Sequence, residues 1–422
     1  MEKKDPVFFI EQKKVKKIPL KSNSFVMITF EEALKISLNQ AVTFGIESIS
    51  FEEAVGRVLS ESIKSDMDIP PFNKSAMDGY ACRRQDLANP MQVIEVIRAG
   101  IPPVKSISEG TCSQIMTGAI IPDGADTVVK VEDCTGGAVD APVPNEIRFV
   151  GEKTGANICY RGEDLKAGEV VLEAGTLLDS RHVPILATVG SVFINVYRLP
   201  SIGVLSTGTE LVEPGETPGL SQIRNTNAYQ MIAQLGKMGI DCDYYGIATD
   251  DEDITRSMIS EALKNNDILI LSGGISMGEF DFVPAVLQSL GINVAYKQVA
   301  IQPGKPTLFG TGQNKFVFGL PGNPVSSYFI LELLVKPFIY KCMGHDWNLP
   351  VLRLRAGERM TRKKSNRLAW MPVRIDREGL VYQIEYHGSA HIFSLRDADG
   401  IIPVPIGKTI IEEGEFVDVR PL

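Results

Sequence analysis

The spacing of hydrophobic and polar residues predicts two helices near the start of the chain. Thr29, followed by Glu31, Glu32 and apolar residues up to Leu38, is typical of a capped amphipathic helix. Residues 50–59 predict a second helix, because acidic residues occupy the expected first turn and apolar residues follow at helical spacing. The ordered protein is therefore expected to begin near residue 27.

The pattern then changes twice. Between about residues 79 and 175, short β-branched runs such as 93–97 and 127–131 alternate with Gly and Pro, which predicts a small all-β module. After residue 200, apolar strands alternate with helical patterns, which predicts βαβ units and a mostly parallel sheet covered on both faces. The expected strands are 202–205, 241–247 and 267–271, and the expected helices are 227–238, 252–264 and 325–340, the last ending near 342–344.

From about residue 345 short strands return, at 352–356, 381–385 and 416–419, and predict a second β module. The fold class is therefore multidomain, α/β plus β. The expected parts are a Lys-rich extension at 1–26, a mixed α/β domain made of 27–70 and 166–198, a small β module at 71–165, an α/β domain at 199–344 and a C-terminal β domain at 345–422.

Composition and charge narrow the function classes. A chain of 422 residues is too long for one core, so about two to four domains are expected. The formal net charge of -9 argues against a general nucleic-acid binder, and no apolar run approaches the ~18 residues of a membrane span. Six cysteines without a Cys-x-x-Cys pair are expected to be free thiols in a reducing cytoplasm. The Lys-rich extension is interpreted as a solvated appendage, with a basic contact arm as the alternative.

Three glycine- or proline-rich segments are candidates for binding anions. Ligands of parallel sheets bind beyond the carboxyl ends of the strands. The strand expected at 267–271 runs into Ser272, Gly273 and Gly274, where backbone N–H groups can approach a phosphate closely. Residues 303–306 add Lys305, and residues 320–324 open the long helix with Asn323 as a cap candidate. The candidate anion-binding residues are Ser272, Gly273, Gly274, Ser276, Lys305, Pro321, Gly322, Asn323, Pro324 and Ser326.

Acidic residues follow the same strands. Glu210 comes after the strand at 202–205, Asp250 and Asp251 after the strand at 241–247, and Asp281 after the Gly-rich loop. Carboxylates beside a phosphorylated substrate repel it unless a divalent cation bridges them, which predicts a Mg²⁺-dependent phosphoanhydride chemistry. The alternative is that each acid caps a helix.

Two other site types have little support. His387 and His391 have a spacing that a helix would turn into a metal pair, but the intervening Gly388 and Ser389 favour a turn. The segment 310–312 lacks the Gly-Lys-Ser/Thr of a Walker loop, so an ordinary ATPase is not indicated.

Seven motifs occur in an order that resembles the molybdopterin molybdenumtransferase family, which includes the bacterial MoeA proteins and the E domain of gephyrin. They are residues 75–81, 115–119, 161–164, 206–208, 272–274, 303–306 and 320–324, within a resemblance that spans about 27–422. The resemblance implies an elongated four-part subunit, a doubly wound MogA-like α/β domain and a barrel-like C-terminal domain. It also implies a homodimer, in which the α/β domain of one chain faces the β module of the other.

The resemblance further implies an activity. Members of the family take adenylylated molybdopterin and molybdate, require Mg²⁺, and release AMP. The catalytic residues carried over by position are Asp78, Thr117, Asp164, Glu210, Asp250 and Asp281. We expect Glu210 and Asp281 to hold the metal, Asp78 to position the pterin or the attacking group, and Pro321 and Pro324 to shape an anion loop. Molybdopterin adenylyltransferase and molybdoenzyme maturation factors are the expected partners besides a second copy of the chain.

The chain departs from the family pattern at four positions. Gln298 and Gln302 stand where many members have lysines, Thr209 replaces a frequent acid, and Pro372 occupies what is often an arginine. These differences leave a tungstate-preferring homologue or a scaffold of the gephyrin type as alternatives. Adenylylation of molybdopterin, the activity associated with the related single-domain fold, is a further alternative, and the flanking β modules and the Asp78 motif argue against it. An Asp281→Ala substitution would separate an enzyme from a scaffold, because a scaffold keeps its partner binding.

Overall fold

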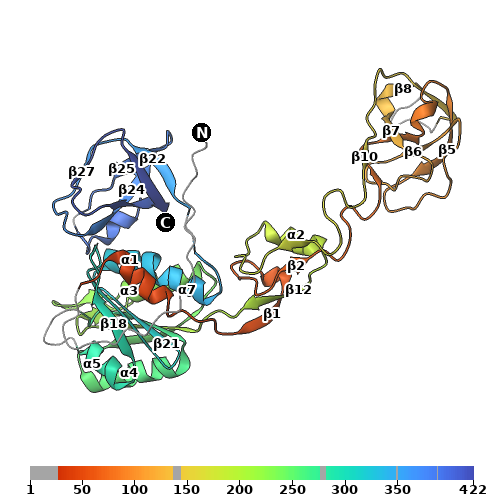
Figure 1. Cartoon of the computed structure of the whole chain (residues 1–422). Coiled ribbons are helices and arrows are strands. Elements are labelled where there is room, and N and C mark those ends of the chain that lie inside the picture. Colours follow the sequence, from red (N-terminus) through yellow and green to blue (C-terminus); the bar gives the residue numbers. More distant parts are fainter. Residues whose placement is uncertain (1–26, 136–143, 276–281, 348–349, 387) are drawn as a thin grey trace, which may run out of the picture. The chain divides into compact units, whose positions relative to one another are not determined.

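A computed structural model describes residues 27–135, 144–275, 282–347, 350–386 and 388–422. The chain divides into two compact units (Figure 1). The first contains Met1–Ala41, Ser201–Phe338 and Asn348–Leu422, and the second contains Val42–Pro200 and Ile339–Trp347. The long middle segment is therefore inserted into a unit that both ends of the chain build.

A small β module in the second unit confirms the strands expected between residues 79 and 175. Its six-stranded sheet has the order β7-β4-β6-β5-β9-β8. The strands are β4 (Gly79–Cys82), β5 (Met91–Ile97), β6 (Thr111–Ile115), β7 (Thr127–Lys130), β8 (Cys134–Thr135) and β9 (Glu146–Phe149). Tyr80, Met91 and Cys112 are fully buried in its core. All six cysteines of the chain are free thiols, as expected.

The rest of the second unit includes two-stranded ribbons, the helix α2 (His182–Thr188) and the end of α7 (Lys336–Cys342). The ribbons pair β1 (Ile46–Ser50) with β12 (Phe193–Tyr197), β2 (Ile63–Lys64) with β11 (Val170–Leu172), and β3 (Lys74–Ser75) with β10 (Ile158–Cys159). All three pairings are antiparallel. Each ribbon therefore joins segments that are far apart in the sequence.

The prediction of a helix over residues 50–59 is wrong. Only a 3₁₀ turn forms, η1 (Phe51–Glu53), and Ser50 Oγ accepts a 3.4 Å hydrogen bond from the Glu52 amide at its start. Gly56 then takes a φ of +83°, which ends any helix. Leu59 donates its amide to the Thr176 carbonyl instead. The apolar residues whose spacing predicts a helix thus form β-bridges with other segments of the second unit.

The α/β domain of the first unit contains a six-stranded sheet of order β16-β13-β17-β21-β20-β18. The first four strands are parallel, and β20 and β18 are antiparallel to their neighbours. The strands are β13 (Ile202–Thr207), β16 (Cys242–Ala248), β17 (Ile268–Ser272), β18 (Asn293–Gln298), β20 (Pro306–Gly312) and β21 (Lys315–Leu320). Helices α4 (Glu252–Asn265) and α5 (Val283–Ser289) pack below the sheet in Figure 1, and α3 (Asn227–Gly236) lies above it. These elements confirm the expected mostly parallel, doubly covered sheet.

The long helix expected at 325–340 forms in three pieces. They are α6 (Pro324–Ile330), a π-helical turn η4 (Leu331–Val335) and α7 (Lys336–Cys342). The π turn buries Glu332, whose carboxylate accepts hydrogen bonds of 3.0 Å from both Lys336 and Gln234. The helix ends where expected, because Gly344 takes a φ of +75°.

The first unit also contains the short pair β14 (Leu211–Val212) and β15 (Ile223–Arg224), one further helix and a closed β domain. Helix α1 (Phe30–Leu38) has the expected capping box between Thr29 and Glu32. In the C-terminal domain β24 pairs with both β25 and β26, and the order β24-β25-β22-β28-β26 closes on itself, as a barrel does. The strands are β22 (Leu352–Ala356), β24 (Leu368–Ile375), β25 (Leu380–Gln383), β26 (Gly400–Val404) and β28 (Phe416–Pro421). Short strands pair beside it as β23 (Met360–Thr361) and β27 (Ile410–Ile411), β19 (Ile301–Gln302) joins β24, and the connection before β26 contains η5 (Ile392–Leu395).

Candidate functional site

A cavity of about 990 Å³ lies at the carboxyl ends of β13, β17 and β21, all within the first unit. The following predicted residues line it: Glu210, Ser272, Gly273, Gly274, Lys305, Pro321, Gly322, Asn323, Pro324 and Ser326. Ser276 is outside the described residues. The three candidate anion segments, which begin at residues 272, 303 and 320 of the sequence, thus meet at one place.

The Gly-rich loop after β17 has a backbone that only glycine accommodates. Gly273 and Gly274 take φ values of +89° and +63°. A Cβ at Gly273 would lie 2.5 Å from the Thr207 carbonyl oxygen, and a Cβ at Gly274 would lie 2.7 Å from Thr207 Oγ1. The Gly273 amide donates to the Leu320 carbonyl at 3.2 Å, so this N–H is not the anion donor that the sequence favours. The glycines therefore bring the loop against β13 and β21 and leave Ser272 at the cavity wall.

Asn227 joins two of the anion segments. Its Nδ2 donates to Ser272 Oγ at 2.6 Å and to the Gly322 carbonyl at 2.8 Å. The residue is only 7% exposed. Because Ser272 Oγ accepts this hydrogen bond, its own hydrogen can be donated to a ligand in the cavity. Asn227 thus fixes the distance between the two segments and the role of the serine hydroxyl.

The start of α6 differs from expectation at Asn323. Pro324 occupies the first turn as expected, but the Asn323 side chain does not cap the helix. Instead Asn323 Nδ2 donates to Ser389 Oγ, in the C-terminal domain, at 2.7 Å. The C-terminal domain also contributes Arg367 and Tyr386 to the cavity wall. The cavity is therefore completed by a domain that the sequence analysis did not connect with the anion segments.

The acidic residues at the strand ends have separate roles. Asp251 is the N-cap of α4 and accepts hydrogen bonds of 2.9 Å from the amides of Asp253 and Ile254. The helix-cap alternative is thus correct for Asp251. Asp250 instead accepts from Thr209, through the hydroxyl and through the amide at 3.2 Å. Asp250 is exposed, and the threonine that replaces a frequent acid holds its carboxylate in place.

Glu210 lies on the cavity wall, in the loop after β13. Gly208 makes this position available, because a Cβ at Gly208 would lie 2.4 Å from Glu210 Oε2. Its predicted partner at the metal, Asp281, is outside the described residues, as is His387 of the weak histidine pair. Across the ranges that the structure describes, no cluster of three or more His, Cys, Asp or Glu residues is arranged to hold a metal.

The four departures from the family pattern lie in different places. Gln302 lines the cavity, and its Oε1 is buried without a hydrogen-bond partner in the described part of the chain. Gln298 lies in β18 opposite Pro306, and Pro372 lies in the barrel opposite Ile401. Neither of these two is part of the cavity wall. The change that bears on anion binding is therefore Gln302.

Three further candidate residues belong to the second unit, described by itself. Thr117 donates to Asp78 Oδ1 through its amide at 2.7 Å and through its hydroxyl at 3.1 Å. Both bonds go to one oxygen of an exposed carboxylate, so Oδ2 can meet a ligand. Asp164 is also exposed and is held by its amide, which donates to the Ile69 carbonyl at 3.0 Å.

Asn227, Arg367, Tyr386 and Ser389 also line the cavity, although they were not predicted from the sequence. Asn227 begins a helix that was expected, and an amide side chain at the first position of the helix that follows β13 was the available signal. For the other three no spacing signal exists, since the C-terminal domain reaches the cavity only through tertiary packing.

Three family models together match most of the chain. They are the MoeA N-terminal region (domain I and II) over residues 28–190, a probable molybdopterin binding domain over 203–341, and the MoeA C-terminal region (domain IV) over 353–422. Helices long and apolar enough to cross a membrane are not found in the described residues.

Relatives of known name match most of the chain. A molybdopterin molybdenumtransferase of Staphylococcus epidermidis is 32% identical over 403 residues, which cover 93% of this chain and 95% of the relative. The Haemophilus influenzae molybdopterin molybdenumtransferase is 37% identical over 334 residues, covering 77% and 80%. A crystal structure of the molybdopterin biosynthesis moeA protein from Pyrococcus horikoshii is 28% identical, with a TM-score of 0.80 and coverage of 94% and 100%. The chain therefore belongs to the molybdopterin molybdenumtransferase family and takes part in molybdenum cofactor biosynthesis.

Proposed function

We propose that this protein inserts molybdate into adenylylated molybdopterin and releases AMP. The observation that carries the proposal is the meeting of three anion segments around one cavity, in a chain whose relatives are named for this transfer. Cleavage of the phosphoanhydride requires that the phosphate be held and that developing negative charge be stabilised. The substrate's adenylyl group must come from an adenylyltransferase, which makes such an enzyme the expected partner.

Within the cavity the residues divide into donors and one acid. Ser272 donates its hydroxyl to a substrate oxygen, since Asn227 occupies its acceptor side. Lys305 and Arg367 supply positive charge for the anion. Glu210 offers the carboxylate oxygen that Mg²⁺ prefers, and the ion would supply neutralisation of phosphate charge.

Asp78 and Thr117 reach this cavity, in our proposal, from the second copy in a homodimer. The second unit exposes large apolar side chains that a partner surface would cover: Ile46 (62% exposed), Val55 (57%), Val192 (52%) and Phe193 (73%). Asp78 Oδ2 then accepts a hydrogen bond from the pterin or the attacking group.

The first experiment measures AMP release from adenylylated molybdopterin with Mg²⁺, comparing molybdate, tungstate and no oxyanion. We expect oxyanion-dependent release that Asp281→Ala abolishes. The oxyanion that gives the faster release shows whether the enzyme uses molybdate or tungstate. Gln302 lines the cavity, so it is the departure from the family pattern to substitute if tungstate is preferred. Absence of release from a correctly folded protein would contradict the proposal and favour a scaffold.

A second experiment tests the shared site. Asp78→Ala and Gly273→Val proteins are each expected to be inactive alone. After their subunits are mixed and exchanged, a heterodimer with a shared site contains one cavity in which both contributions are intact. Recovered activity, up to about a quarter of the wild-type rate for random exchange with independent sites, supports the proposal. Full exchange without recovery would contradict a site shared between subunits.

A further inference from the structure

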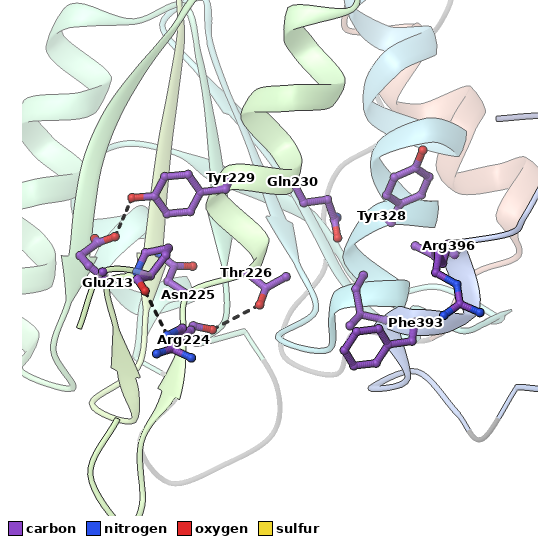
Figure 2. Close-up of a pocket in the computed structure, with 13 residues that line it drawn as sticks. Glu213, Arg224, Asn225, Thr226, Tyr229, Gln230, Tyr328, Phe393 and Arg396 are labelled. Atoms are coloured by element: carbon purple, nitrogen blue, oxygen red, sulfur yellow. Dashed lines mark hydrogen bonds between the residues drawn. The ribbon is translucent and has the colours of Figure 1, made fainter. Parts of the chain in front are cut away.

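A second hollow of about 820 Å³ opens beside the anion cavity, and its lining is mainly apolar. Tyr229 from α3, Tyr328 from α6 and Phe393 from η5 contribute aromatic rings (Figure 2). We call this hollow the aromatic groove. Arg224, Asn225, Thr226 and Ile392 line both the groove and the anion cavity. The two spaces are therefore adjacent and share part of their walls.

The rings of the groove are exposed to an extent that favours a ligand. Phe393 is 73% exposed and Tyr229 is 45% exposed. Phe393 is nevertheless held in place, because its neighbour Ser394 is buried and donates its hydroxyl to the His391 carbonyl at 2.7 Å. An exposed aromatic ring on a fixed backbone is a typical surface for a flat apolar partner.

Polar groups around the groove are mostly satisfied within the protein. Glu213 accepts hydrogen bonds of 2.7 Å from the phenols of Tyr229 and Tyr244, one on each carboxylate oxygen. The hydrogen bond to Glu213 raises the pKa of Tyr229, so the phenol stays a donor at neutral pH. At this part of the wall the groove thus presents the Tyr229 ring, and both carboxylate oxygens of Glu213 are hydrogen-bonded.

Arg224 places positive charge at the boundary between groove and cavity. Its Nε donates to the Pro214 carbonyl at 3.0 Å and to the Glu216 carbonyl at 3.2 Å, which fixes the guanidinium beside the loop. Figure 2 shows Arg224, Asn225 and Thr226 on one side of the groove and Phe393 on the other. A phosphate in the cavity and a ring in the groove would therefore have a cation between them.

We propose that the aromatic groove binds the planar heteroaromatic ring of a ligand whose phosphate lies in the anion cavity. The inference rests on the proposed function, whose substrate has such a ring at each end, a purine and a pterin. Stacking on Phe393 and Tyr229 suits either ring, because both have flat faces with delocalised electrons. The ring that binds in the groove, purine or pterin, thereby determines the orientation of the substrate in the site.

The test uses direct binding to the full-length protein, measured by calorimetry. The probes are AMP, a 6-hydroxymethylpterin phosphate ester, ribose 5-phosphate and inorganic phosphate. Phe393→Ser removes the exposed ring. Phe416→Ser is the matched control, since Phe416 is an exposed phenylalanine of the same unit, 48% exposed, outside the groove.

We expect Phe393→Ser to weaken one ring-bearing probe by about tenfold, the scale expected for one stacked base, and to leave ribose 5-phosphate and phosphate unchanged. Loss of AMP binding assigns the groove to the purine, and loss of the pterin ester assigns it to the pterin. Equal binding of both ring-bearing probes to the variant and the wild type would overturn the inference. So would a wild-type protein that binds neither of them more tightly than ribose 5-phosphate.

The outcome is separable from that of the proposed function. The AMP-release assay tests the reaction itself, whereas these affinities need no turnover. If the wild-type enzyme releases AMP but Phe393→Ser changes no affinity, the proposed function stands and the inference about the aromatic groove is wrong.

Discussion

The cavity of the α/β domain and the Asp78–Thr117 pair of the small β module are built in opposite ways. The cavity is assembled from backbone loops and a buried amide that hold its wall in one geometry. The pair is a single exposed carboxylate with both hydrogen bonds on one oxygen. From this difference we expect anion binding to be a property of the first unit alone, and we propose that the reaction needs the second unit as well.

The largest effect is expected for Asp78→Ala in the second unit, which should lower the rate of AMP release without changing the affinity for AMP. The expected loss of rate is about 10²-fold, the scale for a displaced pterin or attacking group. Single-turnover kinetics and calorimetry measure the two quantities. An Asp78→Ala protein that also loses AMP affinity would contradict the division.

Gly273→Val, in the first unit, is expected to act mainly on AMP binding. A Cβ there would meet the Thr207 carbonyl at 2.5 Å, and the φ of +89° is unfavourable for valine, so the loop must move. We expect AMP binding to fall by about 100-fold, since the shift displaces Ser272 from its hydrogen bond. Gly236→Ala, at an open helical position of the same domain, is the control and should bind normally.

Asn227→Ala should weaken AMP binding by about tenfold, because Ser272 Oγ and the Gly322 carbonyl lose their shared donor. If Asn227 acts through the serine, the double variant with Ser272→Ala should bind little worse than Ser272→Ala alone. Additive losses in this double-mutant cycle would show instead that the two residues act independently.

The smallest expected effects separate the two adjacent acids. Asp251→Ala removes the cap of α4 and should lower stability by about 1 kcal/mol while AMP release per folded enzyme stays the same. Asp250→Ala should change stability little and lower the rate of AMP release. Its exposed carboxylate accepts hydrogen bonds from Thr209 and does not cap the helix. Denaturant melts and rate measurements on both variants decide the assignment, and a reversed pattern would contradict it.

Local chemistry was predictable from the sequence, and long-range assembly was not. The glycine loop, Pro324 and the Thr29–Glu32 cap depend on neighbours within a few residues, so their patterns are visible in the chain. Ser389 meets Asn323 across 66 residues, and that contact depends on how the barrel packs on the sheet. Residues 50–59 failed for the same reason, because Gly56 and the partners of Leu59 override the helical spacing.

The division of the first unit between both ends of the chain has a consequence during synthesis. Phe30 of α1 stacks edge-on against Trp370 at 6.2 Å between ring centroids, and Ser37 bonds the Tyr296 hydroxyl at 2.8 Å. At ordinary elongation rates, helix α1 leaves the ribosome on the order of tens of seconds before Trp370 does. The inserted segment Val42–Pro200 holds most of the second unit and is finished long before that point. The nascent chain therefore has to keep its first helix unpaired until Tyr296 of the α/β domain emerges, and the Phe30 ring without Trp370 until the last domain follows.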